Sequence, residues 1–98
     1  MEITKCVQDT FVSLGLSGRL DTITSPQLER ELKELLPGAK ELVLDFAGLE
    51  YISSAGLRVL LSAKKVMAKQ GEMKLTHVNE TIMEIFEVTG FSEILTIQ

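Results

Sequence analysis

The first 20 residues show two short segments in which apolar and polar positions alternate. In the segment 11–16, every second side chain is apolar: Val12, Leu14 and Leu16. A period of two is typical of a β-strand that has one covered face. The segment 3–7 is also rich in β-branched residues, and the polar residues 8–10 separate the two segments. We therefore predict an antiparallel hairpin at the N-terminus.

A helical pattern follows the hairpin. The apolar stripe falls on four leucines with helical spacing: Leu28, Leu32, Leu35 and Leu36. Thr24 and Gln27 have the spacing of a capping box, and Pro26 is tolerated in the first turn of a helix. Pro37 and Gly38 are typical of a helix end. The pattern predicts an amphipathic helix with Thr24 as its N-cap.

The remaining two thirds of the chain alternate between strand and helix patterns. We expect a strand at 42–46 covered on both faces, a loop at 47–50, a helix from about Ser54 to Lys69, a strand at 73–78, a helix between Asn79 and Gly90, and a strand at 94–97. The element order is β-β-α-β-α-β-α-β. It predicts a single α/β domain over 1–98, with a mixed, mostly parallel sheet and an N-terminal antiparallel hairpin.

The composition narrows the classes of function. The chain of 98 residues carries 10 basic and 14 acidic residues, for a net charge of −4. This balance argues against non-specific nucleic-acid binding and against docking on anionic membranes. The single cysteine, Cys6, and the single histidine, His77, exclude an internal disulfide and the usual zinc clusters. We expect no cofactor or metal, Cys6 buried in the first strand, and a cytoplasmic location because no signal peptide is visible.

The most informative stretch is Ser53-Ser54-Ala55-Gly56, where a strand hands over to a helix. Serine is among the best N-cap residues, so a plain helix cap is one interpretation. Two hydroxyls and a glycine at a helix N-terminus also form a small exposed surface that favours a phosphate group. The stretch is therefore either a simple cap or a site of modification or ligand binding.

Three separated motifs resemble the STAS domain of bacterial anti-sigma factor antagonists. They are LDFAGLEYISSAGLRVLL at 44–61, Gly18-Arg19-Leu20-Asp21 before the first helix, and Glu87-Val88-Thr89-Gly90-Phe91 near the end. The resemblance covers essentially the whole chain and agrees with the predicted order of elements.

The resemblance implies a partner-switching mechanism that regulates transcription indirectly. Such an antagonist binds an anti-sigma factor that is also a serine kinase, and so frees the sigma factor. The kinase phosphorylates a serine at the start of the second helix, and a PP2C-type phosphatase removes the phosphate. The family's target serine stands two residues before the glycine, at Ser54 here. Ser53 stands where the family commonly has Asp, so it is the alternative acceptor.

The resemblance also implies a partner-binding surface. Its expected residues are Asp21, Ser53, Ser54, Ala55, Gly56 and Arg58. Arg58 is expected to point outward, where it pairs with an acidic partner residue or stays solvated. We expect Ala55 and Gly56, as small residues, to let the partner approach closely.

Other functions remain open from the residues alone. Asp21 and Asp45 are expected at the same rim of the sheet as Ser54, where they would serve catalysis or a metal, or only hold turns. A small serine hydrolase would use His77 as its base, but the chain lacks a G-x-S-x-G elbow. A further alternative is a constitutive STAS subunit of another complex, such as a lipid-transport ATPase.

Overall fold

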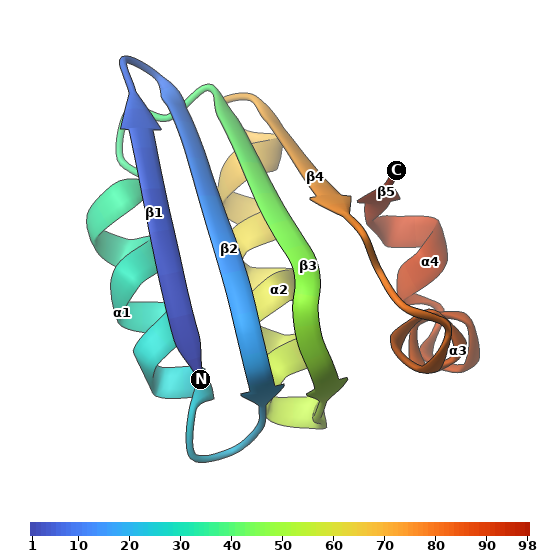
Figure 1. Ribbon diagram of the computed structural model, residues 1–98. Coiled ribbons are helices and arrows are strands. Elements are labelled where there is room, and N and C mark those ends of the chain that lie inside the picture. The colour runs from blue at the N-terminus through green and yellow to red at the C-terminus, as the bar shows by residue number, and fades with distance from the viewer.

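The computed structural model describes residues 1–98 as one five-stranded sheet with four helices (Figure 1). In chain order the elements are β1 (Glu2–Gln8), β2 (Phe11–Leu20), α1 (Ser25–Leu35), β3 (Glu41–Ile52), α2 (Ser54–Ala68), β4 (Glu72–Thr76), α3 (Glu80–Thr89), α4 (Phe91–Ile94) and β5 (Thr96–Ile97). The predicted order is confirmed, with the short helix α4 as an addition and a last strand of only two residues.

The sheet has the predicted mixed topology. Its strand order is β1-β2-β3-β4-β5; β1 runs antiparallel to β2, and every other neighbouring pair is parallel. Parallel pairing brings the carboxyl ends of β2 and β3 together, with Leu20 beside Ile52. This edge of the sheet leads directly into α1 and α2.

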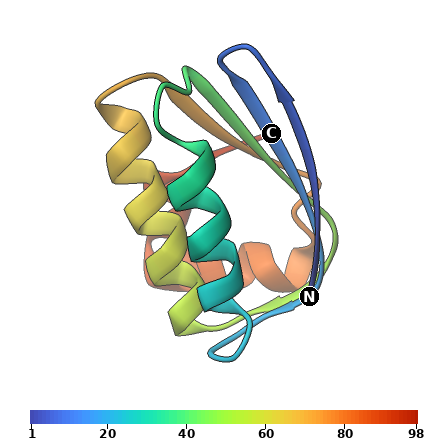
Figure 2. The ribbon, with the colours of Figure 1, turned by 90° about the vertical axis from the view of Figure 1, so that its left-hand side faces the viewer.

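The helices α1 and α2 lie side by side against one face of the sheet (Figure 2). Alternate residues of β2 and β3 point toward them and are buried, including Leu14 and Leu44. Val43 and Asp45 lie between buried neighbours on β3 and remain half-buried. The prediction that β3 is covered on both faces is therefore wrong, because its other face has no helix over it.

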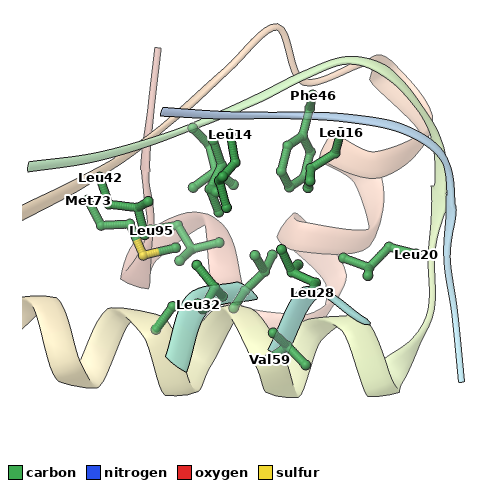
Figure 3. Packing of buried hydrophobic residues seen from close by; sticks show 14 of the residues in the cluster. Leu14, Leu16, Leu20, Leu28, Leu32, Leu42, Phe46, Val59, Met73 and Leu95 are labelled. Atoms are coloured by element: carbon green, nitrogen blue, oxygen red, sulfur yellow. The ribbon is translucent and has the colours of Figure 1, made fainter. Parts of the chain in front are cut away.

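One hydrophobic core fills the space between the sheet and the helices. Leu14, Leu42 and Phe46 of the sheet point toward Leu28 and Leu32 of α1 in Figure 3. The predicted stripe of α1 supplies Leu28, Leu32 and Leu36, each at most 5% exposed. The periodicity of the leucines was therefore a sufficient guide to this packing.

The helix ends differ in how they are capped. Asn79 caps α3 as predicted, since its side chain accepts a hydrogen bond from the N–H of Ile82 at 2.8 Å, and Gly90 ends α3 in the left-handed conformation at φ 83°. The predicted capping box of α1 does not form. The Thr24 hydroxyl is used inside the preceding turn instead.

The free thiol of Cys6 is exposed, so its predicted burial is wrong. Cys6 pairs with Ser13, which lies between the buried Val12 and Leu14 on β2 and so points to the opposite face of the sheet, the face without α1 and α2 (Figure 2). None of the helices is both long and apolar enough to cross a membrane.

Candidate functional site

The candidate site lies where β2 and β3 end together. The N–H of Ser53 donates a hydrogen bond to the carbonyl of Leu20 at 2.9 Å. This bond brings the start of α2 beside the turn that begins at Asp21. Two segments about 30 residues apart in the sequence thus form one corner of the molecule. They meet because neighbouring parallel strands have their carboxyl ends at the same edge of the sheet.

The two serines have different surroundings. Ser53 occupies the N-cap position of α2 with an extended backbone, but its hydroxyl makes no capping hydrogen bond. Its Oγ atom is buried and has no hydrogen-bond partner. Ser54 is the first residue of α2 and is exposed. The interpretation of the pair as a plain side-chain cap is therefore wrong.

Gly56 is buried, contrary to the expectation of an exposed glycine. A Cβ atom at this position would lie 2.8 Å from both Ile52 Cγ1 and Leu20 Cγ. Real Cβ atoms do not approach other atoms so closely, so only glycine lets α2 pack this near the ends of β2 and β3. Gly56 acts through packing, and the small residue left on the surface is the half-buried Ala55.

Asp21 organises the turn between β2 and α1. Its Oδ1 accepts hydrogen bonds from the N–H groups of Ile23 and Thr24, both at 3.0 Å. The Thr24 hydroxyl accepts from the N–H of Asp21 at 2.9 Å and donates to the carbonyl of Arg19 at 2.7 Å. The Thr24 N–H is the main cause that holds the pKa of Asp21 below its ordinary value. The carboxylate is thus a turn former at the edge of the site.

Arg19 and Ile23 also belong to this corner, although neither was predicted to be a site residue. The Arg19 guanidinium carbon lies 4.4 Å from the centre of the Tyr51 ring, and Arg19 Nε lies 3.9 Å from Asp21 Oδ2. Ile23 is 87% exposed, which is unusual for its type. The sequence signal for Ile23 is an isoleucine within an otherwise polar turn. The Arg19–Tyr51 contact follows from the register between β2 and β3.

A hollow of about 380 Å³ lies beside the first turns of α2. Ala55 and Arg58 line it from α2, and Thr22 and Glu29 line it from the α1 side. Arg58 is exposed, as expected, and forms no salt bridge. The corner therefore offers a hydroxyl, a small side chain and a free guanidinium next to an open groove.

Asp45 and His77 do not belong to this corner, and their expected place at the rim beside Ser54 is wrong. Asp45 pairs with Gly15, and Ile52 pairs with Leu20 five positions further along β2, so Asp45 lies about 20 Å from Ser53. His77 Nδ1 lies 3.0 Å from Asp45 Oδ1, in an exposed pair at the end of β4. The only imidazole is therefore far from both serines, so the predicted use of His77 as the base of a serine hydrolase does not fit this site.

Comparisons with known proteins agree on one family. A family model described as "Mlab, STAS domain" matches residues 7–96. BtrV of Bordetella bronchiseptica, whose name describes an anti-sigma factor antagonist, is 38% identical over 99% of this chain and 85% of its own length.

Solved structures share the fold at low sequence identity. An anti-sigma factor antagonist from Mycobacterium paratuberculosis has a TM-score of 0.88 at 20% identity, over 98% of this chain and 83% of that chain. SpoIIAA of Bacillus in its phosphorylated form has a TM-score of 0.75 at 18% identity, over 99% of this chain and 91% of that chain. These two likenesses concern the fold alone.

Proposed function

The chain belongs to the STAS domain family of anti-sigma factor antagonists, and from that premise we propose that phosphorylation of Ser54 switches its binding to a partner. In this proposal the unmodified protein binds an anti-sigma factor that is also a serine kinase, and so releases a sigma factor. The protein itself is a regulatory binding protein, and it acts in the bacterial cytoplasm.

The different exposure of the two serines carries this proposal. Ser54 is exposed at the first position of α2, whereas the Oγ atom of Ser53 is buried. A kinase must bring the γ-phosphate of ATP in line with the acceptor oxygen, which requires access to that oxygen. Access therefore favours Ser54 over the alternative acceptor, Ser53.

The modification is a phosphoryl transfer. The Ser54 oxygen attacks the γ-phosphorus of ATP, the bond to the β-phosphate oxygen breaks, and ADP leaves while the hydroxyl proton is lost to a base of the kinase. A PP2C-type phosphatase reverses the switch by hydrolysing the phosphoserine to serine and inorganic phosphate. Both enzymes are partners of this chain, and the kinase supplies the ATP site.

The charge of the phosphate explains why binding would change while the fold persists. A phosphoserine carries about −1.5 to −2 charges, and a helix N-terminus tolerates negative charge well. The cost therefore falls on a partner packed against Ser54, Ala55 and Arg58. Coupling energies of the usual size, about 1–3 kcal/mol, correspond to a loss of affinity of about five- to 150-fold.

The test compares the affinity of three variants for the cognate anti-sigma factor kinase by titration calorimetry. Ser54→Ala should bind as tightly as the unmodified protein, and Ser54→Asp should bind at least about fivefold more weakly. Thr81→Asp is the matched control, because Thr81 is an exposed hydroxyl residue in the first turn of α3 and does not line the hollow. Equal affinities for Ser54→Ala and Ser54→Asp would contradict the proposal.

The description of the matching family model favours one second candidate. That model is described as "Mlab, STAS domain" and not as an antagonist. The second candidate is therefore the other STAS role left open by the sequence, a constitutive binding subunit of a complex such as a lipid-transport ATPase. An affinity pull-down distinguishes the two candidates. The first predicts that the protein retains a sigma-regulating kinase, and the second predicts that it retains a transport ATPase.

A further inference from the structure

An exposed hydroxyl and an unpaired guanidinium lie on one face of α2. Ser54 and Arg58 are four positions apart on this helix, and both are exposed. Side chains four apart on an α-helix are neighbours, with Cβ atoms about 5–6 Å from each other. The long Arg58 side chain is therefore within reach of a group attached to Ser54 Oγ.

Arg58 is free to make a new contact. It forms no salt bridge with any carboxylate of the chain. Glu29 is the only acidic residue that lines the same hollow, and it does not pair with Arg58. Nothing in the structure competes strongly for this guanidinium.

The other cation of the corner, Arg19, is already engaged. Its guanidinium lies over the Tyr51 ring at 4.4 Å, and its Nε is 3.9 Å from Asp21 Oδ2. Moving Arg19 toward Ser54 would give up both contacts, whereas moving Arg58 gives up no ion pair or cation–π contact. Arg58 is thus the cation that a negative charge on Ser54 would recruit.

We propose that Arg58 captures the phosphate of phosphorylated Ser54 and is thereby withdrawn from the partner protein. This inference rests on the proposed function, in which Ser54 is the acceptor and Arg58 belongs to the binding surface. Guanidinium and phosphate form charge-assisted hydrogen bonds, often two at once. Phosphorylation then changes the surface twice, because it adds a bulky anion and removes the free cation.

The phosphate's own titration tests this capture without any partner. Phosphoserine is incorporated genetically at position 54 of the full chain, and its ionisation is followed by ³¹P NMR across pH 4–8, around the usual midpoint near pH 6. A neighbouring guanidinium favours the dianion, so Arg58→Gln should raise the midpoint. Exposed ion pairs of ordinary strength correspond to a shift of about 0.2–0.7 pH unit.

Two variants serve as controls for the titration. Arg58→Lys keeps the positive charge, so the midpoint of its phosphate titration should stay close to that of the chain with Arg58. Arg30→Gln removes an exposed arginine of α1 that lies outside the hollow, and it should leave the midpoint unchanged. A midpoint that does not respond to Arg58→Gln, or one that rises with Arg19→Gln instead, would overturn the capture by Arg58.

A binding measurement connects the capture to the switch. In the Arg58→Gln background, phosphorylation should weaken kinase binding by a smaller factor than in the parent chain, because the cation is already absent. An equal factor in both backgrounds would overturn the withdrawal of Arg58. If no kinase modifies Ser54 but the titration depends on Arg58, the proposed function fails while the capture stands.

Discussion

Replacing Gly56 with alanine tests how α2 is seated on the sheet. The new methyl group would meet Ile52 Cγ1 and Leu20 Cγ at 2.8 Å, and Leu20 Cδ2 at 3.1 Å. Leu20 and Ile52 are 0% and 1% exposed, so neither side chain can swing into solvent to make room. Either these side chains leave their rotamers or the first turn of α2 moves away from the sheet.

Two opposing effects set the size of the change in stability. Alanine is a better helix former than glycine by about 1 kcal/mol. Inserting a methyl group into a packed core costs about 1–3 kcal/mol, and contacts of 2.8 Å to two buried side chains favour the upper part of that range. We therefore expect Gly56→Ala to lower the free energy of unfolding by about 1–2 kcal/mol, which lowers Tm by about 4–16 °C.

Urea and thermal unfolding, followed by circular dichroism, measure this effect. Ser62→Ala, at an exposed position of the same helix, is the control and should change stability little or raise it slightly. A double-mutant cycle with Leu20→Ala isolates the clash: the methyl group added at position 56 should partly fill the space left by Leu20, so the double variant should be more stable than the sum predicts by about 0.5–3 kcal/mol. If Gly56→Ala is as stable as the parent, or the cycle is additive, the packing argument is refuted.

Three further variants probe the polar contacts. Ser53→Ala should be neutral or stabilise by up to about 1 kcal/mol in urea unfolding, because the hydroxyl it removes is buried, unpartnered and does not cap α2. Gln70→Ala should destabilise by about 1–3 kcal/mol in the same assay, because the Gln70 Nε2 donates to the carbonyls of Leu36 and Ala39 at 2.6 and 2.7 Å. The pKa of Asp21 is lowered in the folded state, so its carboxylate contributes stability above its ordinary pKa that is lost as the pH falls through the lowered value. Asp21→Asn should therefore flatten the acid side of the Tm–pH profile, and an unchanged profile would contradict this assignment.

Much of the fold follows from local patterns in the sequence. The period-two alternation of β2 and the leucine stripe of α1 each point to one buried face, and both faces are buried in one core. Hydrophobic periodicity reports burial directly, which is why these elements are predictable. The α3 cap at Asn79 and the turn at Gly90 are predictable for a similar reason, since each depends on neighbouring residues only.

The incorrect predictions about β3 share one cause, which is strand pairing between residues far apart in the sequence. The residues 47–50 resemble a loop, yet parallel pairing with β2 carries β3 through them to Ile52, with register shifts along the pair. This extension places Asp45 in the middle of a long strand, away from Ser54. A continuous apolar run such as 42–46 also does not reveal whether one face or both are covered.

The candidate site was predictable in part. The meeting of Asp21 with Ser53 and Ser54 follows from the rule that parallel strands end at the same edge of a sheet. The burial of Gly56 depends on Leu20, a residue of another strand, and the orphaned hydroxyl of Ser53 depends on the packing around it. No local pattern encodes contacts of this kind.

The central claim is that Ser54 is the regulated hydroxyl of this antagonist. Phosphosite mapping by mass spectrometry tests it most directly, after incubation of the parent chain, Ser53→Ala and Ser54→Ala with ATP and the cognate kinase. We predict phosphate on Ser54 in the parent chain and in Ser53→Ala, and none in Ser54→Ala. Phosphate on Ser53, or no phosphate at all with a kinase that modifies a control substrate, would contradict the claim.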